Sequence, residues 1–260
     1  MHRISIIIPT YNEEKVISAT LNKIIDYCER KGFDYEIIIV DDGSTDDTLA
    51  IAKKFSSPTS TLLSASTSTL LSAGTSNLLS VNKIKILENK VNRGKGYAVK
   101  CGALEAKKDW ILFTDADLAT PIEELENFSR FQNYDILIAS RALAGSRILS
   151  HQPRFRELGG RFINFFVRWL AVPGIKDTQC GFKLFRSSAA KKIFEKLTID
   201  RFGFDIEVLY IAHKYGFKII ELPVTWSHQP NTKVSPIKDG FRILWDLVKI
   251  KINDFRGLYR

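Results

Sequence analysis

Short apolar runs alternate with longer amphipathic stretches through the first half of the chain. The runs are rich in isoleucine, valine and aromatic residues, as buried strands are, whereas the stretches between them have the length and polarity of helices. The predicted strands are Ile4–Ile8, Tyr35–Val40, Lys83–Leu87, Trp110–Thr114 and Asp135–Ala139, and the predicted helices are Glu13–Lys31, Thr45–Phe55 and Gly96–Lys107. Strands that alternate with helices predict an α/β fold, with a parallel sheet covered by helices on both faces.

Three polar segments follow strands of this predicted sheet. They are Thr10–Glu13, Asp41–Ser44 and Asp115–Asp117. Ligands of open α/β sheets bind beyond the carboxyl ends of the strands, so these segments are expected to form one site.

Asp115 and Asp117 directly follow the buried run Trp110–Thr114. Two carboxylates this close repel each other unless a cation lies between them. Mg²⁺ or Mn²⁺ takes oxygen ligands and often binds through one or two carboxylates together with substrate phosphates. The alternative is a pair of solvated loop acids or a helix cap, but the position after a buried strand favours a metal that carries a diphosphate compound.

The other two segments each allow two interpretations. One of Asp41 and Asp42 can accept hydrogen bonds from a base or a ribose, while the other caps the helix that follows. In the first segment, Tyr11 can stack on a base and Glu13 can hold a ribose, or Asn12 can simply cap its helix.

The turn Asn92–Gly96 combines two glycines with Arg93 and Lys95 at a predicted helix start, an arrangement that favours anions. It lacks the spacing of a phosphate-binding P-loop, and no G-x-G-x-x-G follows the first strand. A P-loop ATPase and a nicotinamide enzyme are therefore disfavoured.

The net charge of +9 arises from two segments of the 260-residue chain. Residues 141–172 hold six arginines and one acid, and residues 233–260 hold seven basic residues and three acids. Such excess indicates nucleic acid, an anionic membrane or a phosphorylated substrate. No apolar stretch approaches the ~20 residues that span a bilayer, and three widely spaced cysteines fit a reducing compartment.

Both basic segments are also amphipathic. Apolar residues recur at helical spacing, and charged and polar residues of both signs occupy the opposite side. The apolar positions are Phe155, Leu158, Phe162, Phe165, Trp169 and Val172 in the first, and Ile237, Phe241, Leu244, Val248, Ile252 and Phe255 in the second. Either helix can pack on the core or lie on a membrane surface. Residues 59–82 read as three octapeptide repeats, interpreted as a low-complexity surface insertion.

Together these motifs resemble the family-2 glycosyltransferases, and more narrowly the dolichyl-phosphate and polyprenyl-phosphate glucosyltransferases. The resemblance is carried by Ile6–Glu14, Ile39–Asp46, Asn92–Gly96, Thr114–Asp117, Gly174–Phe185 and Arg201–Leu209. It implies a GT-A, Rossmann-like, mostly parallel sheet with helices on both faces, plus C-terminal amphipathic helices. Residues 1–230 would form the GT-A domain, and residues 231–260 are interpreted as a C-terminal amphipathic segment that can contact a membrane surface.

The resemblance also implies roles for individual residues. The nucleotide sugar would be held by Pro9, Thr10, Tyr11, Asn12, Glu13, Val40, Asp41, Asp42, Arg93, Gly94, Lys95, Asp115, Ala116, Asp117 and Lys233. Asp115 and Asp117 would bind Mg²⁺ or Mn²⁺, and Ala119 stands where some relatives carry a glutamine. Asp117, Arg141, Arg156 and Asp205 are the predicted catalytic residues, the two arginines gripping the acceptor phosphate and an aspartate serving as base if one is needed.

The implied reaction transfers glucose from UDP-glucose to a polyprenyl or dolichyl phosphate with inversion. The protein is expected to be cytoplasmic and peripheral on the cytosolic face of a membrane. Two alternatives stay open within the family: a GDP-mannose-dependent mannosyltransferase, and an enzyme of polysaccharide synthesis with a non-lipid acceptor. A nonenzymatic RNA-binding protein is disfavoured because aromatic RNA-binding signatures are missing, so no nucleic-acid partner is expected.

Overall fold

The fold was analysed in a computed structural model, which describes residues 2–56, 83–150, 167–168, 170–227 and 236–260. Four of the sequence predictions lie wholly or mostly outside these residues. They are the repeat insertion at 59–82, the amphipathic stretch 155–172, Arg156 and Lys233.

Seven strands of the described chain form one mixed sheet, whose order is β3-β2-β1-β4-β7-β5-β8. The strands are β1 (Arg3–Thr10), β2 (Asp34–Asp41), β3 (Ile84–Glu88), β4 (Trp110–Thr114), β5 (Ile136–Ser140), β7 (Phe182–Arg186) and β8 (Ile219–Pro223). Neighbours pair in parallel except at β7, which runs antiparallel to both β4 and β5. A separate parallel pair joins β6 (Arg147–Ser150) to β9 (Thr225–Ser227). The predicted, mostly parallel α/β sheet is confirmed, whereas the antiparallel strand β7 was not predicted.

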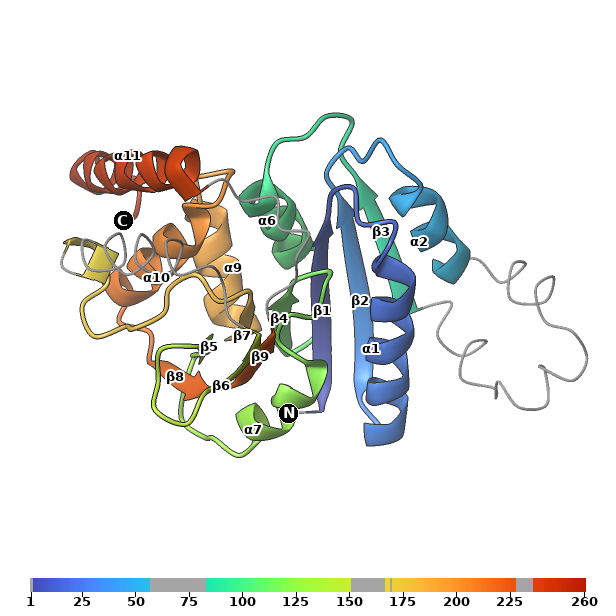
Figure 1. The fold of residues 1–260 in the computed structure, drawn as a ribbon. Helices are drawn as coiled ribbons and strands as arrows, with labels where there is room; N and C mark the ends of the chain where they lie inside the picture. Colours follow the sequence, from blue (N-terminus) through green and yellow to red (C-terminus); the bar gives the residue numbers. More distant parts are fainter. Residues whose placement is uncertain (1, 57–82, 151–166, 169, 228–235) are drawn as a thin grey trace, which may run out of the picture.

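Helices cover both faces of the sheet (Figure 1). One face carries α1 (Ile17–Lys31), α2 (Thr48–Ser56), the short 3₁₀ helix η2 (Ile122–Glu124) and α7 (Leu125–Ser129). The other carries α6 (Lys95–Glu105), α9 (Ser187–Lys196), α10 (Phe204–Lys214) and α11 (Pro236–Phe255). Within the described ranges, no helix combines the length and the apolar content that crossing a bilayer requires.

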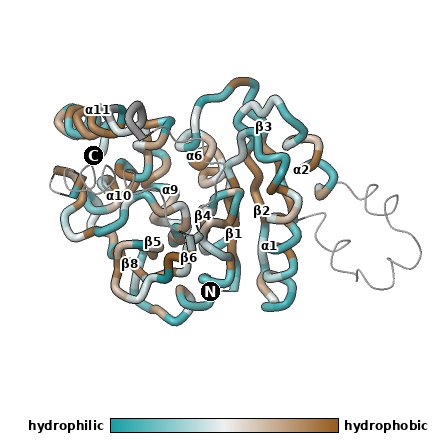
Figure 2. The backbone as a smooth tube through the Cα atoms, in the orientation of Figure 1, coloured by the Kyte–Doolittle hydropathy of each residue, from teal (hydrophilic) through white to brown (hydrophobic). Residues whose placement is uncertain are grey.

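The continuous apolar character of the strands follows from this two-sided burial. Ile6 and Ile8 of β1 face the α1 side, whereas Ile7 between them faces the α6 side. Figure 2 shows the resulting hydrophobic colour along β1 and β2. Helix α6 comes unusually close to β1 because Gly102 has no side chain: a Cβ there would lie 2.5 Å from a methyl carbon of Ile7.

Candidate active site

The loops that follow β1 and β2 are bonded to each other at the carboxyl edge of the sheet. The Asn12 side-chain oxygen accepts the Thr45 backbone N–H at 2.8 Å, and the Asn12 N–H donates to Ser44 Oγ at 3.0 Å. The Glu13 N–H donates to Thr48 Oγ1 at 2.6 Å. Because these bonds hold residues 12 and 13 outside a helix, α1 begins four residues later than predicted. Asn12 links the two loops and does not cap α1.

Asp41 closes the turn after β2. Its carboxylate accepts hydrogen bonds from the Ser44 backbone N–H at 3.0 Å and from the Ser44 hydroxyl. The Thr10 hydroxyl lies 3.5 Å from the same carboxylate. Since Asp41 is 2% exposed, it serves mainly as the turn residue of the two acids. The sequence predicted that one acid of the pair caps the helix that follows, but α2 begins at Thr48, and the Thr48 N–H donates instead to Asp46 at 3.0 Å.

Asp42 holds the glycine-rich turn. Its Oδ1 accepts hydrogen bonds from Asn89 Nδ2 at 2.9 Å and from the Arg93 N–H at 3.0 Å, and its Oδ2 accepts the Gly94 N–H at 2.6 Å. The carboxylate therefore fixes the turn against the end of β2. By fixing this turn, Asp42 places Lys95, the first residue of α6, beside the candidate metal ligands Asp115 and Asp117.

Lys95 forms an ion pair with Asp115, with 2.6 Å between Nζ and Oδ1. Its ammonium also lies 5.2 Å from the centre of the Phe113 ring. Burial alone would lower the pKa of Lys95, but Asp115, Asp205 and Asp117 outweigh it and raise the pKa. Lys95 therefore stays charged and supplies a fixed positive charge at the end of β4.

The neighbouring Arg93 points along the outside of the turn. Its guanidinium carbon lies 3.5 Å from the centre of the Tyr97 ring, and an amino group lies 3.3 Å from Asp200. The turn is thus fastened to the loop before α10, because the Tyr97 N–H also donates to the Asp200 carbonyl at 3.0 Å.

Asp115 and Asp117 occupy a tight turn directly after β4. Leu118 takes a positive φ of 46°, uncommon for a branched side chain, and its N–H donates to the Asp115 carbonyl at 3.2 Å. Asp117 Oδ1 accepts the Ala119 N–H at 2.9 Å. Burial raises the pKa of Asp117, and the Asp115 carboxylate beside it raises it further. Two acids are held together here against their mutual repulsion.

Gly181 makes room for the Asp115 carboxylate. A Cβ at this glycine would lie 2.0 Å from Asp115 Oδ2, a distance that no real pair of atoms of this kind allows. The Gly181 carbonyl also accepts the Asp115 N–H at 3.2 Å. Any other residue at position 181 would push this carboxylate out of place.

The donor set fits Mg²⁺ or Mn²⁺ bound mainly by substrate. Asp115 and Asp117 offer hard oxygen ligands, and a divalent cation would relieve the repulsion that raises the pKa of Asp117. Across the described ranges, no group of three or more His, Cys, Asp or Glu residues is placed to hold a metal. Such a pair suits an ion that keeps water and phosphate ligands, not a site closed by protein alone.

Asp205, predicted as a possible base, lies behind these acids in a buried ion pair. Its carboxylate contacts the Lys183 ammonium, and the two residues are 4% and 1% exposed. Lys183 Nζ also donates to the Cys180 carbonyl at 2.7 Å. This arrangement favours a supporting role for Asp205, so its catalytic role stays a prediction.

Arg141 follows β5 and binds Asp177 through two guanidinium nitrogens, Nε at 2.7 Å and Nη2 at 2.9 Å. The Arg141 N–H adds a third bond at 2.9 Å. The guanidinium carbon lies 5.3 Å from the centre of the Trp226 ring, and the side chain remains 29% exposed. Burial alone would raise the pKa of Asp177, but Arg141 lowers it to about 2. The guanidinium is thus held rigidly in a side chain that is not fully buried.

Three predicted site residues expose too little side chain to contact a ligand fully. Val40 is fully buried on the α6 side, and Ala116 is buried with its carbonyl bonded to the Thr20 hydroxyl at 2.6 Å. Pro9 is half-buried within β1. These residues shape the floor of the site, so any contact with a ligand would come mainly from their backbone.

Sequence reasoning singled out Gly174–Phe185 as a motif without assigning roles within it. The structure places Asp177, Gly181 and Lys183 from this segment against Arg141, Asp115 and Asp205. The motif itself was the sequence signal from which these three residues could have been predicted. Their partners lie far away in sequence, which is why the pairing itself was missed.

Comparisons with known proteins identify the family of the chain. Residues 5–194 match the family Glycosyl transferase family 2. The dolichyl-phosphate beta-glucosyltransferase of Homo sapiens is 31% identical over 99% of this chain and 78% of the relative. The protein of the same name from Dictyostelium discoideum is 34% identical over 99% of the chain and 76% of the relative.

Solved structures share the fold. The glucosyl-3-phosphoglycerate synthase of Mycobacterium tuberculosis, bound to UDP, has a TM-score of 0.59 at 18% identity and covers 96% of this chain and 80% of its own. The mannosyltransferase PcManGT of Pyrobaculum calidifontis, bound to GDP-Man and Mn²⁺, has a TM-score of 0.56 at 17% identity, covering 97% and 64%. Since the family match covers most of the chain and the named relatives align over nearly all of it, the chain belongs to glycosyl transferase family 2 and is a glycosyltransferase similar to the dolichyl-phosphate beta-glucosyltransferases.

Proposed function

We propose that this enzyme transfers glucose from UDP-glucose to a polyprenyl or dolichyl phosphate, with inversion at the anomeric carbon. The main support for this proposal is the group of charged side chains at the carboxyl edge of the sheet. Asp115, Asp117 and Lys95 lie together after β4, beside the bonded loops after β1 and β2. The names of relatives that are at least 30% identical over nearly the whole chain support glucose as the sugar and dolichyl phosphate as the acceptor.

At the donor end, the loops after β1 and β2 would hold the nucleoside, with Tyr11 and Glu13 as the contacts predicted from the sequence. Asp115 and Asp117 would hold Mg²⁺ or Mn²⁺, which supplies Lewis-acid stabilisation of the departing diphosphate when bound. Lys95, fixed beside Asp115, would add its own positive charge near the same oxygens.

At the acceptor end, Arg141 would orient the lipid phosphate. Asp177 holds its guanidinium by two bonds, and an anion would approach the Arg141 side chain where it is exposed. A phosphate monoester has a second pKa of ~6 and is already largely ionised near neutral pH. Positioning therefore matters more than a strong base, and Asp205 can remain in its ion pair with Lys183. An acceptor of this kind resides in a membrane, so we expect the enzyme to be peripheral on its cytosolic face.

A donor-swap assay tests this proposal. Purified protein is incubated with Mn²⁺, a short polyprenyl phosphate, and either labelled UDP-glucose or labelled GDP-mannose. We expect label in the lipid phase from UDP-glucose only. Transfer from GDP-mannose alone would replace the proposed donor, and transfer to an acceptor without a lipid phosphate would replace the proposed acceptor.

The metal assignment has its own test. Asp117→Asn is expected to lower Mn²⁺ affinity, measured by calorimetry in the presence of UDP, and to reduce transfer by at least about 100-fold. Asp26→Asn is a matched control, because Asp26 is an exposed acid of α1. Wild-type metal affinity in the Asp117 variant would refute the role of this carboxylate.

A further inference from the structure

Helix α11 has two apolar faces, and one of them has no packing partner in the described part of the chain. Ile243, Leu247 and Ile250 point inward and are at most 7% exposed. Trp245 and Phe255 point outward and are 69% and 92% exposed. Val248 and Ile252 lie between these two on the outer face, at helical steps of three and four, and are exposed as well.

The apolar stripe predicted from the sequence therefore divides between the two environments. Of its described members, Val248, Ile252 and Phe255 are exposed and Leu244 is half-buried. The core contact is made instead by the inward residues Ile243, Leu247 and Ile250, which lie one or two positions from members of the stripe. Packing on the core thus explains only part of the apolar surface of this helix.

The helix cannot roll to bury its outer face, because polar bonds fix its inner face. Asn253 donates to Thr198 Oγ1 at 2.8 Å. Asp254 accepts the Tyr210 hydroxyl at 2.6 Å and contacts the Lys214 ammonium. Rotating α11 about its axis would break all of these bonds.

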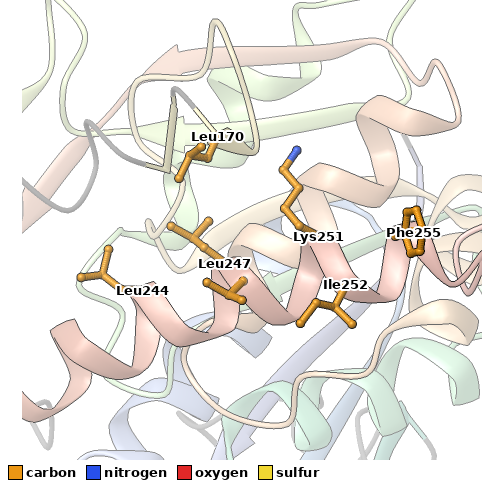
Figure 3. Close-up of a pocket in the computed structure, with 7 residues that line it drawn as sticks. Leu170, Leu244, Leu247, Lys251, Ile252 and Phe255 are labelled. Carbon is orange, nitrogen blue, oxygen red and sulfur yellow. The ribbon is translucent and has the colours of Figure 1, made fainter.

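An open apolar groove of about 540 Å³ continues this surface. Figure 3 shows Leu170 approaching the helix from the segment before β7, opposite Leu247 and Lys251. The other lining residues are Leu244, Val248, Ile252 and Phe255. An exposed surface this apolar and this open marks a place where another apolar phase docks.

Basic residues border the outer face on both sides. Arg242, Lys249 and Arg256 recur every seven residues along one border, and Lys251 lies on the other. Residues 242–260 hold five basic and two acidic residues, a net charge of +3. The face therefore has an apolar centre, an exposed tryptophan and a cationic rim.

We propose that the outer face of α11 lies in the interfacial region of a membrane that contains anionic lipids, with the helix axis parallel to the membrane plane. An apolar stripe flanked by basic residues is the pattern of helices that lie on bilayers. A second copy of this chain fits less well, because a two-fold contact would bring one cationic rim against another. The role of this membrane contact in the reaction rests on the proposed lipid acceptor. Membrane binding itself requires no sugar donor.

Flotation on vesicles tests the inference. Vesicles of phosphatidylcholine alone are compared with vesicles that also hold phosphatidylserine, all without polyprenyl phosphate or nucleotide. Wild-type protein is expected to float with the anionic vesicles, and less so as salt rises. Trp245→Ala combined with Phe255→Ala should weaken partitioning at least about tenfold, a factor equal to about 1.4 kcal/mol. Phe131→Ala removes an exposed aromatic residue from the α7 region and should leave binding unchanged.

A second measurement uses the wild-type fold. Trp245 fluorescence, isolated by subtracting the spectrum of Trp245→Phe, should be quenched by lipids brominated on their acyl chains. Absence of quenching, or equal flotation on neutral vesicles, would overturn the proposal. So would a dimer in solution that dissociates in the double variant while vesicles bind neither protein. Because these vesicles contain no substrate, failure here leaves the proposed transfer reaction intact, and loss of transfer alone leaves the docking surface intact.

Discussion

The bond between Arg141 and Asp177 permits a sharp prediction about stability. Asp177→Asn removes the negative charge and leaves one oxygen to accept hydrogen bonds that two oxygens now receive. Asp177 accepts three bonds from Arg141, and the Gln179 N–H donates a fourth at 3.2 Å. The variant thus leaves a guanidinium beside an amide that cannot neutralise it.

The expected loss is about 2.5 kcal/mol of the free energy of unfolding. A carboxyl pKa lowered from its ordinary 3.8 to about 2 corresponds to roughly this value. Breaking a buried ion pair by removing one partner costs about 3–5 kcal/mol of stability. Because the Arg141 side chain is 29% exposed, the cost for this pair should lie at or below the lower end of that range.

Urea denaturation followed by circular dichroism measures the loss at pH 7. Asp34→Asn is the matched control: Asp34 also pairs with cations, Lys108 and Arg3, but its side chain is 52% exposed. This control should lose less than about 1 kcal/mol. An Asp177 variant as stable as the Asp34 variant would refute the argument.

The pH dependence follows from the direction of the shift. Because the folded-state pKa of Asp177 lies below the unfolded value, its ionised carboxylate stabilises the fold fully above about pH 5. That contribution is lost as the pH falls from about 4 towards 2. The difference between wild type and Asp177→Asn should therefore be constant near neutrality and shrink below about pH 4. A difference that does not change with pH would contradict the assigned cause.

Three further changes have defined outcomes. Gly181→Ala should abolish transfer with little loss of helical signal in circular dichroism, because its Cβ would displace the Asp115 carboxylate; activity near wild type would contradict this. Tyr259→Phe should cost about 1 kcal/mol in urea denaturation, since the Tyr259 hydroxyl donates to buried Glu207. Burial, aided by Glu207, raises the pKa of Asp246 to about 6, so stability should fall as the pH rises from about 4 to 6. Asp246→Asn should remove that slope from the pH profile of thermal unfolding, and an unchanged slope would reject the assignment.

Much of the architecture was predictable because it follows from the pattern of neighbouring residues along the chain. The apolar runs of β1, β2 and β4 and the helices between them were predicted with ends that differ by up to four residues from those observed. The grouping of the acidic segments at one edge followed from the parallel arrangement of these strands. Strand β7 was missed because its five residues give no local sign of antiparallel pairing between β4 and β5.

The candidate site divides in the same way. Asp115 and Asp117 were identified from their position after a buried strand, whereas the contacts of Lys95 and Gly181 with Asp115 join residues far apart in the chain. Asp42 was expected to hold a nucleoside, and the structure engages its carboxylate with the glycine-rich turn. Ligand contacts by the predicted residues remain predictions.

Helix α11 combines one property that its sequence predicts with another that depends on tertiary contacts. An amphipathic helix over residues 237–255 could be predicted without a structure, because apolar periodicity is a property of neighbouring residues. Which side of that helix meets the core could not: Leu247 and Ile250 face inward while Trp245 and Phe255 face outward. The rotation of a helix about its axis is set by the partners it meets, here Thr198 and Tyr210, and those partners are brought there by the folding of the rest of the chain.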